Sequence, residues 1–135
     1  RRAELAGIGD RTVFLGEVSG AGKWALLRKA AVFCLPSRSE NFGLAALEAA
    51  AVGTPTVISP QVGVAVELAA VAPVKVSRTD ATELSRALLE VLSDVETARH
   101  RAAACVVGVR SRFSWERIAV ATREVYLRGA ASASP

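Results

Sequence analysis

The sequence predicts an α/β domain of the doubly wound, Rossmann-like kind with a mostly parallel sheet, and three observations support this. Short apolar segments of strand length alternate with longer segments in which apolar residues recur at helical spacing. The segments between successive strands are long enough for the helical crossovers that parallel strands require. Glycine, proline and polar residues separate these segments, as turns do.

The expected elements follow one another along one domain, residues 1–128. The sequence predicts strands at 11–15, 31–35, 56–59 and, at a sheet edge, 74–76. It predicts the end of a helix at 3–8 and further helices at 23–30, 42–52, 80–92, 95–109 and from 115 onward. Asp80-x-x-Glu83 forms a capping box, and Ser114 is the expected N-cap of the last helix. The small and polar residues 129–135 predict a disordered tail.

The segment 36–55 is the most informative part of the sequence. It follows an expected buried strand, so its loop opens at the carboxyl end of a parallel sheet, where such folds bind ligands. Asn41 is a suitable N-cap, and the amides of Phe42, Gly43 and Leu44 would then have no acceptor within the helix. Free amides and the helix dipole together favour a phosphate group.

Two carboxylates accompany these amides. If both were helical, Glu40 and Glu48 would lie about two turns apart and roughly 80° around the helix, too far for an acid and base pair. They suit a long ligand whose hydroxyls each carboxylate binds. Two plainer interpretations stay open: Ser37-x-x-Glu40 also fits a capping box, and Glu48 also fits a solvated helix face. Arg38 is expected at the surface.

The segment resembles the donor-binding motif of the retaining GT-B glycosyltransferases called family 4 or group 1. The resemblance is carried by Pro36-Ser37, Glu40-Asn41-Phe42-Gly43-Leu44, Leu47-Glu48-Ala49 and Gly53-Thr54-Pro55-Thr56-Val57, with the glutamates spaced as E-x7-E. Val13-Phe14-Leu15-Gly16 and Phe113-Ser114-Trp115-Glu116-Arg117 extend it on both sides. The resemblance implies the C-terminal half of a GT-B fold.

The resemblance also implies roles for individual residues. Glu40 is the candidate catalytic residue and would orient the donor sugar rather than act as a nucleophile. The donor-binding residues would be Ser37, Asn41, Phe42, Gly43, Leu44 and Glu48, with the amides at the diphosphate and Glu48 at the ribose hydroxyls. No metal and no cofactor are implied. The partners would be a nucleoside diphosphate sugar and an N-terminal acceptor-binding domain, which is missing here together with the family's upstream Arg/Lys pair.

One departure from the family pattern lies in the next loop. Relatives usually carry Gly-Gly-x-x-Glu there, whereas this chain has Val62 before Gly63, with Glu67 four residues further on. A second glycine would allow closer approach of a ligand to the backbone. Glu67 is therefore open to two interpretations, a ligand contact or a solvent-exposed side chain.

Composition narrows the remaining classes of function. No apolar run is long enough for a transmembrane helix, and aromatic and basic residues do not interleave, which argues against nucleic-acid binding. Cys34 and Cys105 are expected to be reduced core thiols, and the lone His100 a surface residue. The net charge of +4 leaves peripheral contact with an anionic membrane open for an otherwise cytoplasmic protein. The absence of methionine suggests a piece of a longer polypeptide.

Two alternatives from other classes remain. The same cleft could hold a nucleotide in a non-catalytic binding module, or the domain could be structural with an inactive cleft. Their common prediction is that no sugar is transferred. Fold alone does not decide between them and a transferase.

Overall fold

A three-stranded parallel sheet lies at the centre of the computed structural model, which describes residues 2–132. The strands are β1 (Phe33–Leu35), β2 (Thr56–Ile58) and β3 (Lys75–Val76), in the order β1-β2-β3. Phe33 lies opposite Thr56, and Ile58 opposite Val76. The α/β class with a parallel sheet is therefore confirmed, as are three of the four expected strands.

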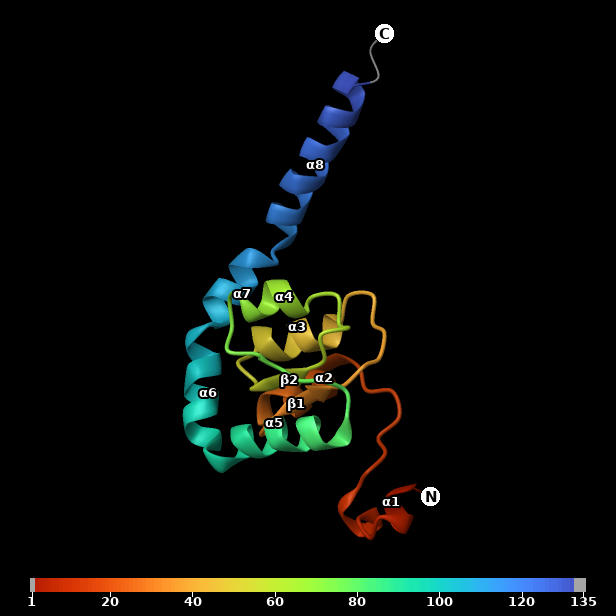
Figure 1. Cartoon of the computed structure of the whole chain (residues 1–135). Coiled ribbons are helices and arrows are strands. Elements are labelled where there is room, and N and C mark those ends of the chain that lie inside the picture. Colours follow the sequence, from red (N-terminus) through yellow and green to blue (C-terminus); the bar gives the residue numbers. More distant parts are fainter. Residues whose placement is uncertain (1, 133–135) are drawn as a thin grey trace.

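Helices connect and cover these strands. They are α1 (Arg2–Leu5), the 3₁₀ helix η1 (Gly9–Arg11), α2 (Gly20–Lys29), α3 (Leu44–Ala51), α4 (Ala65–Ala69), α5 (Ala81–Ser93), α6 (Val95–Ala104), α7 (Val106–Arg112) and α8 (Trp115–Ser132). Helices α3 and α4 lie on one side of the sheet and α5 on the other, while α8 projects from the body of the domain (Figure 1). The arrangement leaves the loops after β1 and β2 at one edge of the sheet.

The core between the sheet and α3, α4 and α7 is made of small and branched apolar side chains. Ile58, Leu68 and Val109 have no exposed surface, and each such side chain contributes about 1.5–3 kcal/mol when fully buried. Ala46 and Ala50 on α3 are also buried, so α3 approaches the sheet closely. This packing fixes α3, the helix that carries the motif.

Two arginines hold the C-terminal ends of α2 and α3. The guanidinium of Arg99 donates hydrogen bonds to the carbonyl oxygens of Arg28, Lys29 and Ala30 at 3.2, 2.8 and 2.8 Å. Nε of Arg110 donates to the carbonyl oxygen of Ala51 at 2.9 Å. A cation at the end of a helix satisfies its last carbonyls and interacts favourably with its dipole. Helices α6 and α7 thereby fix the orientation of α2 and α3.

Helix starts agree with the capping predictions. The carboxylate of Asp80 accepts a hydrogen bond from the amide of Glu83 at 2.9 Å, and the Ser114 hydroxyl accepts one from the amide of Arg117 at 3.2 Å. Asp94 caps α6 in the same way, and this hydrogen bond from the Thr97 backbone lowers the pKa of Asp94. Cys34 and Cys105 are both partly exposed and are not the core residues that were expected, and burial raises the pKa of the Cys34 thiol.

The strand predicted at residues 11–15 is not present. Val13, Phe14 and Leu15 are 77%, 84% and 58% exposed, and no strand among the described residues pairs with this segment. Apolar composition favours a strand, but a strand forms only where its backbone groups have partners. The segment is an extended connection between η1 and α2 instead.

Three further features of the helices differ from the sequence prediction. The helix expected at 95–109 is divided at Cys105 into α6 and α7, and α2 begins at Gly20 rather than at Lys23. Helix α8 continues to Ser132, whereas a tail was expected from Gly129; residues 133–135 of that tail lie outside the described residues. Between residues 2 and 132 no helix has the length and apolar character needed to cross a membrane.

Candidate functional site

The motif occupies the loop from β1 to α3, as predicted, but its helix begins later than expected. The N-cap of α3 is Gly43, with φ 92° and ψ 49°, and the helix starts at Leu44. The prediction that Asn41 is the N-cap is therefore wrong. Residues 41 and 42 are held outside the helix because the amide of Val64 donates to the carbonyl oxygen of Phe42 at 2.8 Å.

The amides at this helix start have no hydrogen-bond acceptor among residues 2–132, and of the three residues Phe42 and Leu44 are exposed while Gly43 is buried. None of the N–H groups of Phe42, Gly43 and Leu44 donates to an acceptor within the part of the chain that the structure describes. The left-handed conformation of Gly43, followed by right-handed helical residues, turns successive N–H groups toward one side. The dipole of α3 adds partial positive charge at the same point. This geometry favours an anionic group such as a phosphate.

Gly43 is the residue that this turn requires. Its φ of +92° is rarely adopted by residues with a side chain, and a Cβ placed on it would lie 2.4 Å from Cγ1 of Val62. Val62 is itself 1% exposed and belongs to the core. The residue that replaces the family's first glycine therefore packs beneath the motif and leaves no room for a larger residue at position 43.

A second loop, residues 60–64 after β2, is hydrogen-bonded along the motif. The amide of Glu40 donates to the carbonyl oxygen of Gln61 at 3.2 Å, and the amide of Gly63 donates to the carbonyl oxygen of Glu40 at 3.0 Å. Glu40 and Val62 form a parallel β-bridge. Glu40 thus has an extended, paired backbone, which excludes the alternative capping box with Ser37.

The two loops approach each other so closely that Gly63 has no space for a side chain. A Cβ on Gly63 would lie 2.0 Å from the carbonyl oxygen of Asn41 and 3.2 Å from Cα of Phe42. The remaining glycine of the family pattern therefore has a packing role between the loops. Glu67, on α4, is exposed.

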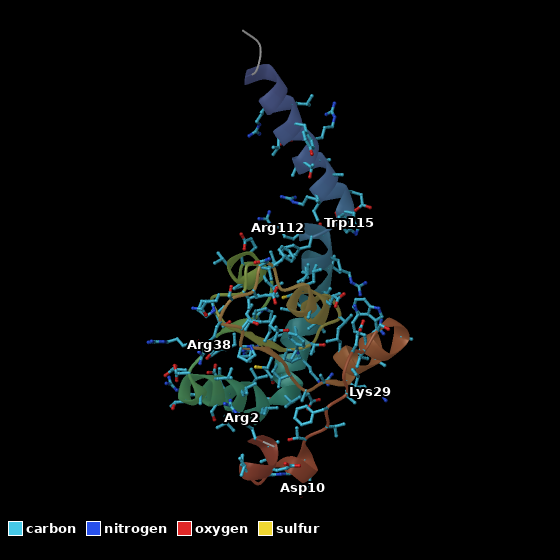
Figure 2. The ribbon with its side chains drawn as sticks, turned by 90° about the vertical axis from the view of Figure 1, so that its right-hand side faces the viewer. Arg2, Asp10, Lys29, Arg38, Arg112 and Trp115 are labelled. Carbon is cyan, nitrogen blue, oxygen red and sulfur yellow. The ribbon has the colours of Figure 1, made fainter. Side chains whose placement is uncertain are left out.

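The other residues of the first loop are less constrained. Glu40 is partly buried and Asn41 and Phe42 are exposed. The hydroxyl of Ser59, at the end of β2, donates to the carbonyl oxygen of Ser37 and so ties the loop to the sheet. The side chain of Arg38 points away from the domain (Figure 2), in agreement with the surface position expected for it.

Glu48 does not lie on a solvated helix face. Its Oε1 accepts an ion-paired hydrogen bond from Nζ of Lys23 at 2.7 Å, and the two side chains are 28% and 34% exposed. Lys23 lies in the first turns of α2, which packs beside α3. Because Glu40 is not helical, the offset expected between the two carboxylates does not apply. The two acidic residues belong to separate elements, a paired loop and a helix face.

Sequence reasoning missed Lys23 as a residue of this site. Twenty-five residues separate it from Glu48, and the two meet only because α2 and α3 pack side by side. No local pattern indicates this contact. The lysine could be found only once the packing of the two helices was known.

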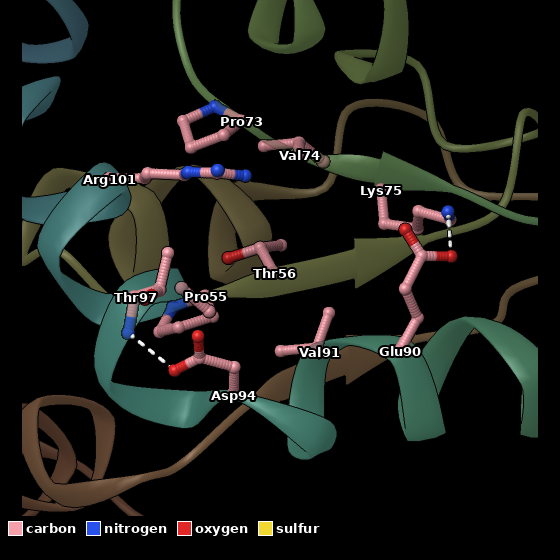
Figure 3. Close-up of a pocket in the computed structure, with 11 residues that line it drawn as sticks. Pro55, Thr56, Pro73, Val74, Lys75, Glu90, Val91, Asp94, Thr97 and Arg101 are labelled. Carbon is pink, nitrogen blue, oxygen red and sulfur yellow. Dashed lines mark hydrogen bonds and ion pairs between the residues drawn. The ribbon is translucent and has the colours of Figure 1, made fainter.

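A pocket of about 370 Å³ lies at the opposite end of the sheet (Figure 3). It opens at the amino ends of β2 and β3, between α5 and α6, and includes Thr56, Lys75, Glu90, Asp94 and Arg101. Pro55 and Thr56, at the end of the motif, line it, but none of the loop and helix-start residues 36–48 does. Ligands of open parallel sheets bind at the carboxyl ends of the strands, so we base the site on the motif loops and not on this pocket.

The structure brings together no group of three or more His, Cys, Asp or Glu side chains that could hold a metal ion, as far as residues 2–132 are concerned. The site offers two other kinds of group. The amides of residues 42–44 can donate hydrogen bonds to an anion, and the carboxylates of Glu40 and Glu48 can accept them from hydroxyls of the same ligand. Chemically the site can bind and orient such a ligand.

Comparison with known proteins gives a consistent result. Residues 1–104 match the family described as Glycosyl transferases group 1. The chain is 39% identical over 117 residues to a glycogen synthase of Mycobacterium tuberculosis (strain H37Rv), covering 86% of this chain and 28% of that protein. It is 35% identical over 123 residues to the lipopolysaccharide core biosynthesis mannosyltransferase LpcC of Rhizobium leguminosarum bv. viciae, covering 90% and 34%.

A solved structure shows the same relationship. The sucrose-phosphate synthase from Thermosynechococcus elongatus superposes with a TM-score of 0.80 and 29% identity, over 98% of this chain and 33% of that one. The chain thus spans about a third of the length of these relatives.

Proposed function

The chain belongs to the group 1 glycosyl transferases, and from this premise we propose that it is the donor-binding part of a retaining enzyme. Its fold is a Rossmann-like half of the GT-B type, as in the sucrose-phosphate synthase to which it is similar. The donor would be a nucleoside diphosphate sugar, and the reaction would move the sugar to an acceptor hydroxyl. Acceptor binding would require the part of such enzymes that this chain does not span.

One observation supports this proposal: three adjacent amides without a described acceptor lie where the first loop enters α3, and this loop is hydrogen-bonded to the loop at 60–64. The diphosphate would accept hydrogen bonds from the amides of Phe42, Gly43 and Leu44. The same amides would stabilise the negative charge that develops on the leaving diphosphate. Because Gly43 and the loop at 60–64 fix this geometry before any ligand arrives, little reorganisation is needed on binding.

The carboxylates would hold the two ends of the donor. Glu40, whose backbone is fixed by the bridge to Val62, would accept hydrogen bonds from sugar hydroxyls and so orient the anomeric carbon. Glu48 would accept from the ribose hydroxyls. Ser37 and Asn41, in the same loop, would contribute further polar contacts to the donor.

Calorimetric titration of the chain tests this assignment. We expect a nucleoside diphosphate sugar to bind at least about tenfold more tightly than ATP, since the site offers contacts to a sugar and to one diphosphate. We also expect weak binding overall and no sugar transfer, because the chain spans only about a third of the length of its relatives.

The alternatives give different results in the same titration. A regulatory nucleotide-binding module would bind ATP as well as, or better than, the diphosphate sugars. A structural domain with an inactive cleft would bind none of them while remaining folded. Turnover of a donor by the chain alone would contradict the expectation that another domain is required.

A further inference from the structure

The ion pair between Lys23 and Glu48 differs from the other side-chain ion pairs of the described residues. The others involve at least one side chain that is more than half exposed, whereas Lys23 and Glu48 are 34% and 28% exposed. Their Nζ and Oε1 atoms are 2.7 Å apart. Exposed ion pairs contribute little to stability, because water competes for both charges and the long side chains remain mobile. The partly buried pair of Lys23 and Glu48 is therefore the one whose geometry is most closely defined.

The lysine is held on a second side as well. Its Nζ lies 4.8 Å from the centroid of the Trp24 ring, within the range of a cation–π interaction. The start of α2 is thus fixed against α3 by a contact that involves both side chains, while Arg99 fixes the other end of α2. A lysine stem is flexible, and these contacts restrict it to one position.

The pair leaves one carboxylate oxygen of Glu48 available. Oε1 accepts from Lys23, and Oε2 has no hydrogen-bond partner among residues 2–132. No described side-chain oxygen is both buried and without a partner, so Oε2 is reachable by solvent. An ionised carboxylate has about four acceptor sites, and a single ammonium contact leaves most of them free.

We propose that Lys23 is a positioning residue, which holds Oε1 of Glu48 so that Oε2 accepts a hydrogen bond from a ribose hydroxyl of the donor. This inference rests on the proposed function, because it assumes that Glu48 binds the ribose. Without Lys23 the carboxylate would rotate freely and would lose orientation before binding. If the ammonium instead competed with the ribose for Glu48, removal of Lys23 would strengthen binding of the ribose form and not weaken it.

The experiment compares ribonucleotides with their 2′-deoxy counterparts. The chain is first titrated with UDP, GDP and ADP and with their 2′-deoxy forms dUDP, dGDP and dADP. The base whose ribose form binds most tightly is then used to compare the variants. In the unmodified chain we expect the ribose form to bind about tenfold more tightly than the deoxy form, the effect of one hydrogen bond to a charged group. In Lys23→Ala we expect this ratio to fall about threefold or more, with affinity for the deoxy form nearly unchanged.

Three further variants separate positioning from a loss of structure. Lys23→Arg retains a cation and should restore most of the preference for ribose, whereas Lys23→Gln should resemble Lys23→Ala. Lys75 also pairs with a glutamate on another element, Glu90. Lys75→Ala is therefore the matched control and should leave the preference for ribose over deoxyribose unchanged. Thermal unfolding of each variant identifies any that is misfolded. If Lys23→Ala is misfolded, Lys23→Gln is compared with the unmodified chain instead.

Two results would overturn the inference while leaving the proposed function intact. A ribose preference that is the same in Lys23→Ala, Lys23→Gln and the unmodified chain would show that Lys23 does not position Glu48. Tighter binding of the ribose form in either variant would show that Lys23 competes with the ligand. Absence of nucleotide binding by the unmodified chain would overturn the proposed function and this inference together.

Discussion

Replacing Gly63 by alanine is expected to separate the two loops of the candidate site and to lower the free energy of unfolding by about 2–3 kcal/mol. The added Cβ would lie 2.0 Å from the carbonyl oxygen and 2.8 Å from the carbonyl carbon of Asn41. Both are backbone atoms, so no side-chain rotation relieves the overlap. The loops must move apart, and the hydrogen bonds from Gly63 to Glu40 and from Val64 to Phe42 weaken.

Chemical denaturation of the variant measures the loss of stability, and titration with a nucleoside diphosphate measures the loss of binding. Gly108→Ala is the matched control, because a Cβ on Gly108, within α7, meets nothing within 4 Å. Alanine there is expected to leave stability unchanged or to raise it by up to about 1 kcal/mol. If Gly63→Ala were as stable as the control, the close approach of the two loops would be wrong.

Replacing Glu48 by alanine is expected to weaken nucleoside diphosphate binding by about 10- to 100-fold, the range expected for a lost hydrogen bond to a charged group. The change removes the carboxylate that we assign to the ribose hydroxyls and leaves the Lys23 ammonium without its partner. Alanine is a good helix former, so α3 itself should be retained. Weaker binding should therefore not be accompanied by loss of the fold.

Calorimetry of Glu48→Ala and Glu90→Ala separates ligand binding from loss of an ion pair. Glu90 pairs with Lys75 between α5 and β3, away from the motif, and its removal should leave nucleotide affinity unchanged. Equal affinity in Glu48→Ala and the unmodified chain would contradict the ribose assignment. Equal losses in both variants would point to a general effect of charge.

Local sequence patterns predicted the framework of this site well. The apolar run before Pro36, the Gly-Thr-Pro entry to β2 and the cap at Asp80 each depend on residues close in sequence, and each was found where expected. The position of the motif after β1 followed from the same reasoning. Its amides have no described acceptor, although with Gly43 as the N-cap only Leu44 of these three residues lies within α3.

Features that depend on contacts between distant segments could not be predicted. Asn41 has a good capping side chain, yet the hydrogen bond between Val64 and Phe42 keeps it outside the helix and transfers the N-cap to Gly43. The pair of Lys23 with Glu48 depends on how α2 packs on α3. The segment at 11–15 has strand composition, but no partner strand lies beside it within the described chain.

The most direct test of the account is a titration of the ¹⁵N-labelled chain with nucleoside diphosphates, followed by amide chemical shifts. We expect the largest saturable shifts at Phe42, Gly43 and Leu44, with smaller ones in the adjoining loop around Gly63. Shifts confined to the pocket at the other end of the sheet, around Thr97 and Arg101, would contradict it. So would nucleotide binding that leaves the amides of residues 42–44 unchanged.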